Sequence, residues 1–417
     1  MEAYNGLRSI NRLPDEVLSN IVSFLPLKDA VRTSVLSKRW RYIYTSSSNL
    51  VFDFGGFLNS EDSMPEPIDV IDVVNKVLFA RSGSPINKFF LGGLDSQPLD
   101  LQCLESWISD LTLHDSIFEI PTKVSLPSLK ELHLDSAIPF SNDNSAESLL
   151  SNCPILEHLF YMFRDKDCKF FVSHPTLKSL SLDCMCKEGR SINFEIAINA
   201  PSLVFLKYNV QDVNSHNFVN VQSLTEADIG FYHKEVDHLR YTNVATDLLK
   251  GISKVQKLAI SVATLEDLLN FGIPIPVLHN LSHLTLFDCN DDHDSSILLR
   301  LLARCESLET LVFKVFPDKW NLDALYSLGE SRISCLLSRL KTIEIEEFGE
   351  TVFGEIDNQM ELVKYLMSEA KVLESVKVQI AWGPYEAQLR IANKLSTLPR
   401  ASKTCGLLIC YKSYNLC

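Results

Sequence analysis

Residues 177–182 read Leu177-Lys178-Ser179-Leu180-Ser181-Leu182, and this short stretch predicts the main architecture of the chain. Its first, fourth and sixth positions are apolar. The last two apolar residues alternate with a polar one, which is the pattern of a β-strand with one buried face. A single short strand cannot bury that face by itself, so neighbours with the same pattern must stack against it.

The same pattern, apolar-x-x-apolar-x-apolar, returns along most of the chain. Its twelve occurrences begin at Ile86, Ile108, Leu129, Leu156, Leu177, Leu203, Leu224, Val255, Leu281, Leu308, Leu340 and Leu373. Successive starts lie 21 to 33 residues apart, and most of these spacings fall in the window of roughly 20–29 residues that is typical of leucine-rich repeats. We therefore expect an α/β solenoid with a parallel sheet on its concave face and helices or turns on its convex side.

Residues 12–44, before the repeats, have the pattern of three short helices. Pro14, Asp15 and Glu16 make a favourable helix start, and Ser37 is expected to cap the third helix. So few residues bury only a thin core. The apolar residues exceed what that core needs, which leaves two alternatives: a helical cap on the following domain, or a surface that docks on another protein.

The order of residues in this segment closely resembles an F-box. The matching stretches are Arg12 to Leu18, Ile21, Ser23 to Pro26, and Ala30 to Arg41. The resemblance covers about residues 8–52 and implies binding to a Skp-type linker protein, which connects to a cullin scaffold and a RING subunit. By resemblance, the linker-binding residues are Leu13, Pro14, Ile21, Leu25, Leu27, Val31, Leu36 and Trp40.

The end of the chain resembles the FBD domain, a module that follows an F-box and leucine-rich repeats in plants. The resemblance is carried by residues 336–341, 361–365, 370–373 and 394–402, and it implies a cap on the end of the solenoid. We expect an F-box at 8–52, a breaker-rich linker at 53–67, a repeat solenoid at 68–335 and FBD-like repeats with a cap at 336–405. The family usually has more sequence between Trp107 and Leu129, so the completeness of the repeats near residues 100–125 stays open.

Charge is unevenly distributed. The net charge is −14; the first fifty residues carry +3 and the remainder −17, which predicts two surfaces with separate partners. On the concave face the candidate target-binding residues are His133, Phe160, Ser181, Lys207, Asp228, Thr285, Glu344 and Lys377. Ala259 and Val312 share this strip. Two acidic residues balance two basic ones, so the strip favours a protein or peptide, with Phe160 as a candidate anchor, over a nucleic acid.

Catalytic and metal-binding patterns are weak in this sequence. No phosphate-binding or nucleophile-elbow motif is present. The loop from Asp288 to Asp294 begins like a calcium loop, but His293 replaces the required Gly. Cys168, His174, Cys184 and Cys186 lack the usual zinc spacing. We expect no cofactor, no metal and no catalytic residue, and we expect Cys153 and Cys305 to be small buried side chains.

These patterns lead to one main functional hypothesis and two others. The main one is a substrate-recognition subunit of an SCF-type (Skp–cullin–F-box) cullin-RING ubiquitin ligase, which is not itself an enzyme. The alternative is a non-degradative interaction scaffold that binds the same linker, and a weaker one is a small-molecule receptor. No apolar run is long enough to span a membrane and no signal peptide is evident, so we expect a cytoplasmic or nuclear protein that contacts neither membrane nor nucleic acid.

Overall fold

The computed structural model describes residues 10–53, 70–81, 85–92, 126–134, 150–163, 168–184, 194–211, 213–232, 238–287, 296–314, 333–349 and 356–411. The chain divides into two compact units, Met1–Leu203 and Val204–Cys417, which are described separately. The predicted repeat at Ile108, the segment 100–125, the acidic loop 288–294 and the predicted linker beyond Asp53 lie outside the described residues.

The first unit begins with short helices, as predicted. They are η1 (Ile10–Arg12), α1 (Asp15–Val22), α2 (Leu27–Arg32), η2 (Thr33–Val35) and η3 (Trp40–Ser46). The third predicted helix is a 3-10 helix that begins at Trp40, and Ser37 does not cap it. The backbone carbonyl of Ser37 instead accepts a hydrogen bond from the Trp40 N–H in the preceding turn. The core of these helices is thin: Leu18, Val22, Ala30, Trp40 and Ile43 form it, with Tyr44 packed alongside.

The first unit continues into a parallel sheet, whose strands are β1 (Asn49–Asp53), β2 (Lys88–Gly92), β3 (Glu131–Leu134), β4 (His158–Phe163) and β6 (Ser179–Cys184). Neighbours pair in that order, with Leu50 beside Phe89 and Leu132 beside Leu159. Sequence reasoning missed β1, where buried Ser47, Leu50 and Phe52 repeat the spacing of the later strands with serine in place of leucine. Between β1 and β2 the chain forms α4 (Val70–Phe79).

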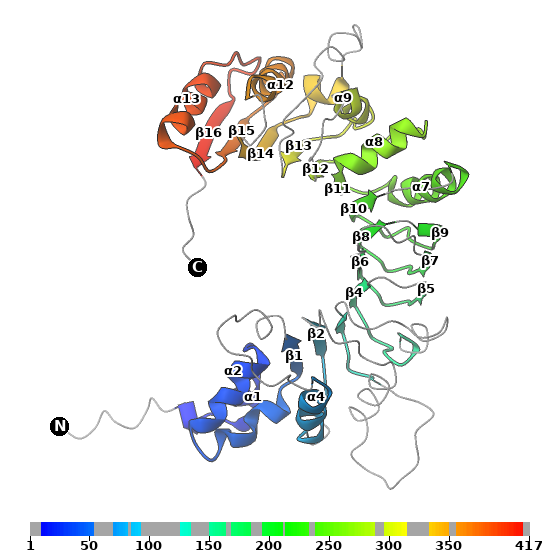
Figure 1. Ribbon diagram of the computed structural model, residues 1–417, viewed down its shortest axis with the longest axis vertical. Coiled ribbons are helices and arrows are strands. Elements are labelled where there is room, and N and C mark those ends of the chain that lie inside the picture. The colour runs from blue at the N-terminus through cyan, green and yellow to red at the C-terminus, as the bar shows by residue number, and fades with distance from the viewer. Residues whose placement is uncertain are drawn as a thin grey trace, which may run out of the picture. The chain divides into compact units, whose positions relative to one another are not determined.

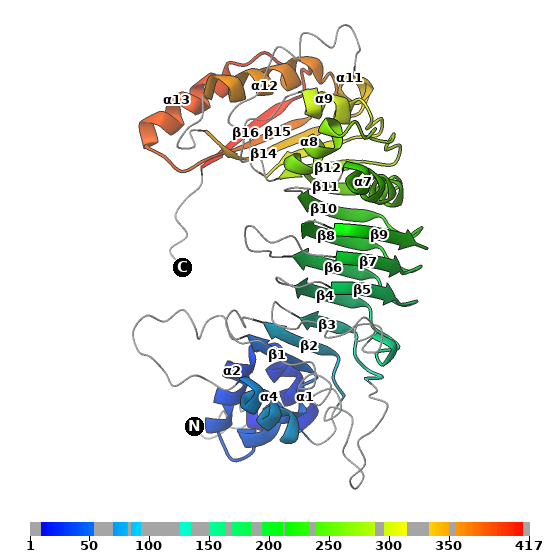
Figure 2. The ribbon, with the colours of Figure 1, turned by 45° about the vertical axis from the view of Figure 1, so that its right-hand side comes forward.

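On the outer side of this unit the sequence predicted helices or turns, and this expectation was wrong for two repeats. Strands β5 (Cys168–Ser173) and β7 (Phe194–Asn199) pair there in parallel, beside β4 and β6 (Figure 2). Phe170, Val172, Ile196 and Ile198 are buried at every second position. A period of two residues favours a strand, because a helix would bury every third or fourth residue.

The second unit is a parallel sheet with helices on one face (Figure 1). Its strands are β8 (Phe205–Gln211), β10 (Glu226–Tyr232), β11 (Lys257–Ser261), β12 (His283–Phe287), β13 (Thr310–Phe313), β14 (Thr342–Phe348), β15 (Ser375–Ile380) and β16 (Gly406–Tyr411). An outer strand, β9 (Val213–Val219), packs against α7. The helices are α7 (His238–Ile252), α8 (Val262–Asn270), α9 (Ser296–Leu302), α11 (Ser334–Ser338), α12 (Ile356–Glu369) and α13 (Tyr385–Ser396).

The repeat pattern sets the core of the second unit. The first apolar residue of each repeat is buried ahead of its strand, and the other two are buried within it, as at Leu281, Leu284 and Leu286. The C-terminal end contains α12 and α13, in which Met360, Val363 and Leu395 are buried. Strand β16 was not predicted; it pairs with β15 and carries the sheet past residue 405.

Among the described helices, none is long and apolar enough to cross a membrane.

Candidate protein-binding surfaces

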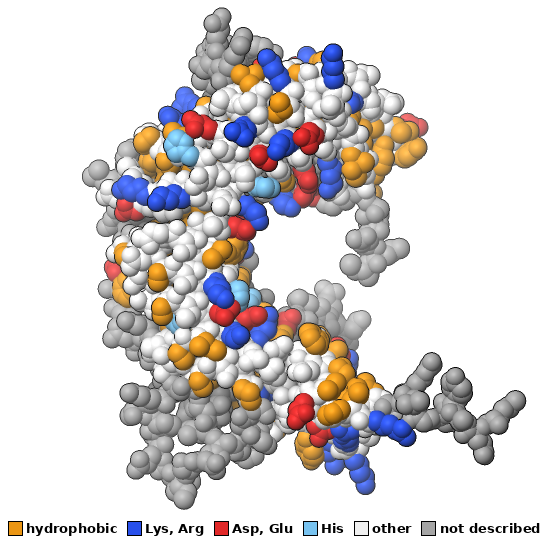
Figure 3. Space-filling view, turned by 180° about the vertical axis from the view of Figure 1, so that it is seen from behind, with side chains coloured by type: hydrophobic (Ala, Val, Ile, Leu, Met, Phe, Trp, Pro, Cys, Tyr) orange, Lys and Arg blue, Asp and Glu red, His pale blue; other side chains and the backbone are white. Residues whose placement is uncertain are grey.

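The N-terminal helices carry an exposed apolar surface. Its members are Ile10, Leu13, Val17, Ile21, Phe24, Leu25, Val31, Val35, Leu36 and Tyr42, which together are called the N-terminal apolar patch. Phe24 and Val35 each expose 85% of their surface. Figure 3 shows hydrophobic side chains gathered at this end of the first unit, with Lys and Arg beside them. Contiguous exposed apolar surface of this kind marks a protein-binding site more often than an isolated exposed side chain does.

Most of the predicted linker-binding residues lie on this surface. Leu13, Pro14, Ile21, Leu25, Val31 and Leu36 are exposed. The side chain of Leu27 lies outside the part of the chain that the structure describes. Exposure makes the six residues available to a partner, while their role as linker contacts stays a prediction.

Trp40 departs from the prediction. Its side chain is only 2% exposed and belongs to the small core with Leu18, Val22, Ala30 and Ile43. Its indole Nε1–H donates a hydrogen bond to the side-chain oxygen of Asn11. A side chain enclosed in this way cannot also contact a partner directly, so we reassign Trp40 from a contact residue to one that supports the patch from below.

Sequence reasoning left Ile10, Val17, Phe24, Val35 and Tyr42 out of the predicted contact set. The surplus of apolar groups in this segment was the available signal, since it counted Val35 among the residues that a thin core does not need. The ends of the short helices decide which of the extra apolar residues are exposed. The sequence does not define those ends sharply.

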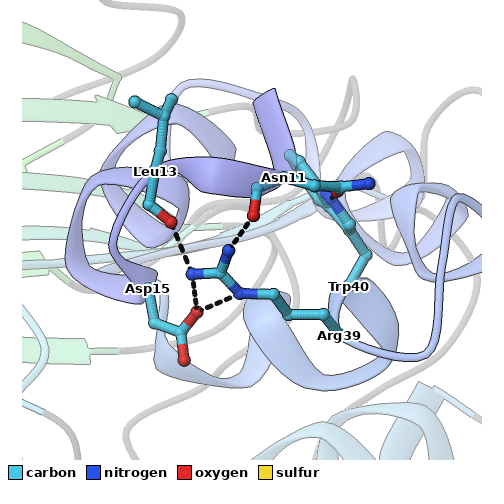
Figure 4. Close-up of polar contacts among 5 residues, drawn as sticks. All are labelled: Asn11, Leu13, Asp15, Arg39 and Trp40. Atoms are coloured by element: carbon cyan, nitrogen blue, oxygen red, sulfur yellow. Dashed lines mark hydrogen bonds and ion pairs between the residues drawn. The ribbon is translucent and has the colours of Figure 1, made fainter. Parts of the chain in front are cut away.

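Arg39 connects the N-terminal segment to the start of α1. Its guanidinium donates to the backbone carbonyls of Asn11 and Leu13, and its Nε donates to Asp15 Oδ1 at 2.7 Å (Figure 4). Asp15 also forms an ion pair with Arg39 at 2.5 Å. Arginine suits this position because its planar fork supplies several donors in fixed directions. These contacts of Arg39, called the Arg39 bracket, hold Leu13, a predicted contact residue, at a defined place beside α1.

Replacing Arg39 with alanine should therefore loosen residues 10–14 without unfolding the helices. The ion pair is exposed and contributes little, so we expect a loss of about 1–2 kcal/mol, mostly from the carbonyl contacts. Amide hydrogen exchange of Leu13 should accelerate, while that of the buried Leu18 should not. Arg39→Lys serves as a control for charge, and equal protection of Leu13 in all three proteins would contradict the proposed bracket.

Alternate residues of the first unit's main strands form a strip on the sheet. Phe90, His133, Phe160 and Ser181 occupy matching positions on β2, β3, β4 and β6. The Phe160 ring stacks on His133 with centroids 3.8 Å apart, and His133 lies 4.2 Å from Phe90. Three of the predicted target-binding residues are thus adjacent. Phe90 was missed, although the same register in the Ile86 repeat identifies it.

In the second unit the remaining predicted target-binding residues also align. Lys207, Asp228, Thr285, Glu344 and Lys377 occupy matching positions on their strands, with Ala259 and Val312 between them. Lys377 Nζ lies 3.5 Å from Glu344 Oε2, so these two charges largely offset each other. A strip of balanced charge offers no continuous row of cations for a phosphate backbone. Contact with a target stays a prediction for all of these residues.

The cysteines that the sequence placed in the core are indeed buried. Cys153 and Cys305 have no exposed surface, and Cys335 is buried as well. Burial raises the pKa of the Cys153 thiol to about 12 and that of Cys335 to about 11, and it also raises the pKa of Cys305. His174 is buried too, and its Nε2 lies 2.9 Å from the carbonyl oxygen of Cys153. Within the described residues, no group of three His, Cys, Asp or Glu could hold a metal ion.

These pKa values predict selective thiol chemistry. At pH 8 the buried thiols stay protonated, and only thiolates react readily. Native protein treated with iodoacetamide should therefore leave Cys153, Cys305 and Cys335 unmodified, whereas the half-buried Cys410 should react first among the described cysteines. Cys153, Cys305, Cys335 and Cys410 should all react when the protein is unfolded in urea. Mass spectrometry identifies the modified residues. Rapid native labelling of Cys153 would contradict the packing described for it.

Three family models match parts of this chain. The F-box domain model matches residues 10–51, the Leucine Rich Repeat model matches residues 128–154, and the FBD model matches residues 330–378. An F-box/LRR-repeat protein of Arabidopsis thaliana is 32% identical, over 98% of this chain and 95% of its own length. This chain belongs to the F-box/LRR-repeat family. A putative F-box/FBD/LRR-repeat protein of the same plant is 30% identical, over 89% of this chain and 86% of its own length.

The matches confirm the predicted family and the mixed α/β architecture of this F-box/LRR-repeat protein. The F-box match covers the N-terminal apolar patch and the Arg39 bracket, and it ends within β1. The FBD match begins before α11 and ends within β15, so α13 and β16 follow it. The exact domain boundaries stay a prediction.

Proposed function

We propose that this F-box/LRR-repeat protein is the substrate-recognition subunit of an SCF-type cullin-RING ubiquitin ligase. The observation that carries the proposal is the N-terminal apolar patch, which lies on the residues that the F-box model matches. A Skp-type linker would cover that patch and connect the chain to cullin and RING subunits. The relatives' names identify F-box and repeat modules and add no partner.

Physical considerations support tight binding through the patch. Each fully buried large apolar side chain contributes roughly 1.5–3 kcal/mol, so a few central anchors suffice for a stable complex. The positive net charge of the first fifty residues suits an acidic partner and favours fast association, although apolar contacts supply most of the affinity.

The repeat strips would hold the target. In this proposal the ubiquitin-loaded enzyme is carried elsewhere in the complex, and the chain accelerates transfer by keeping a target lysine close to it. No catalytic residue of this chain takes part. The adjacent Phe90, His133 and Phe160 rings are the proposed aromatic anchor, because aromatic side chains dominate the central contacts of protein interfaces. The complex would act in the cytoplasm, the nucleus or both.

Affinity capture of the full chain from plant cells treated with a proteasome inhibitor tests this role. The expected result is co-capture of linker, cullin and RING subunits, together with ubiquitinated proteins that disappear when Phe160 and Phe90 are replaced by serine. Linker capture without cullin or ubiquitinated proteins would instead support the non-degradative scaffold. Absence of the linker would overturn both readings.

A further inference from the structure

The second unit has an open bowl between helix α7 and the loop that follows strand β9. Its volume is about 330 Å³. Its lining includes Phe218, Leu224 and Gly251, which are called its floor, and the charged residues Asp247, Lys250 and Lys254, which are called its edge. A volume of this order matches the lower end of ligand sites in proteins. The Phe218 ring packs edge-on against the buried Tyr208, with centroids 5.9 Å apart.

The floor is open because Gly251 has no side chain. Glycine in a helix is destabilising relative to alanine, so its presence needs a reason. A glycine near a helix end often serves as a left-handed cap, but the positive-φ glycines of the described chain are Gly272 and Gly349. Crowding is not the reason either. A Cβ at Gly251 would lie 3.8 Å from its nearest neighbours, Phe218 and Val221, which is ordinary van der Waals contact. The fold therefore tolerates a side chain here, and what its absence provides is room in the bowl.

The edge of the bowl carries one surplus positive charge. Lys250 Nζ pairs with Asp247 Oδ1 at 3.1 Å, and both lie in the last turns of α7, where a lysine also complements the helix dipole. Lys254 is exposed, and no carboxylate of the described residues pairs with it. Most of the chain beyond residue 50 is strongly acidic. An unpaired lysine beside an apolar floor therefore favours a ligand that combines one apolar group with negative charge.

We propose that this bowl is a second protein-docking site, which takes a short acidic segment of a partner with one apolar side chain seated over Gly251. The apolar side chain contacts Phe218 and Leu224, and a flanking carboxylate pairs with Lys254. The side-chain amides of Asn217 and Gln222, which also line the bowl, are placed to bond the backbone of an extended segment. The site is formed by residues of the second unit alone, includes no residue of the N-terminal helices, and does not depend on linker binding.

Fluorescence polarisation of labelled peptides with the full chain tests the proposal. The probe is the pentapeptide Glu-Asp-Leu-Asp-Glu. One comparator replaces leucine with glycine, and another replaces all four acids with lysine. With one buried anchor and one ion pair, we expect a dissociation constant on the order of 10⁻³ M for the probe, and at least about tenfold weaker binding of both comparators. Gly251→Leu and Lys254→Glu should each weaken the probe by a similar factor.

Two controls separate a filled site from a damaged fold. Lys257→Glu removes a lysine that pairs with Glu226 and does not line the bowl, so probe affinity should not change. Gly251→Ala should melt at the same temperature as the natural protein or higher. Equal binding of all three peptides, or full affinity in Gly251→Leu with an unchanged melting temperature, would overturn the proposal. If Gly251→Leu fails to fold, full affinity in Lys254→Glu overturns it instead.

Discussion

Trp40→Ala should destabilise the N-terminal helices by about 3–5 kcal/mol, the range expected when a buried tryptophan is removed. The loss is large because Trp40 is 2% exposed and central to a core of only a few side chains. It also removes the hydrogen bond to Asn11. Hydrogen exchange of α1 and α2 measures the effect, and their amide protection should fall by more than about 100-fold.

The matched control for this change is Tyr42→Ala, two residues away on the same 3-10 helix. Tyr42 is 65% exposed, so its removal should alter stability by less than about 0.5 kcal/mol. Trp40→Phe keeps most of the packing and should fall between the two. If Trp40→Ala lost linker binding but kept full protection of α1, tryptophan would be a direct contact after all, as its place in the F-box motif first implied.

The double substitution Val35→Glu with Leu36→Glu should have the largest effect on partner binding. Both side chains are exposed, at 85% and 62%, so the free protein should keep its melting temperature. In the complex, two apolar contacts are lost and two carboxylates are desolvated without partners. We expect affinity for a Skp-type linker to fall by more than about 100-fold, which corresponds to about 3 kcal/mol or more. Calorimetric titration of the full chain with the linker measures it.

Val372→Glu provides the control for adding a carboxylate to an exposed apolar position. Val372 is exposed to a moderate degree, lies next to α12 and is remote in sequence from the N-terminal patch. Linker affinity should therefore stay within about twofold of the natural protein. Retention of full affinity by the Val35 and Leu36 double variant would remove these residues from the interface.

Much of the repeat architecture could be predicted from the sequence, because each strand buries two alternating residues behind a leucine-like anchor. Leu284 and Leu286 follow Leu281 in this way, and the same spacing placed Thr285 between them on the exposed strip. The repeat pattern alone therefore predicted which strip residues lie side by side on neighbouring strands. Side chains alternate between the two faces of a strand. Once the buried residues are known, the residues between them must therefore lie on the opposite face.

The parts that could not be predicted depend on packing between segments. Ser47 stands ahead of strand β1, at the position where later repeats have leucine, so the leucine-based pattern does not detect this strand. Trp40 and Val35 both belong to the F-box motif, yet one is buried and the other exposed, because a thin core accepts only a few of the available apolar groups. Gly251 gave no sequence signal, since its meaning depends on the space beside Phe218.

Reconstitution of the full chain with a purified Skp-type linker and cullin tests the central claim most directly. Light scattering on a sizing column gives the composition of the complex. The account predicts a stable assembly with one copy of this chain per linker, which recruits cullin and is lost in the Val35 and Leu36 double variant but kept in Val372→Glu. A chain that stays separate from the linker, or one that binds it equally in all three forms, would contradict the assignment of the N-terminal apolar patch as the docking surface.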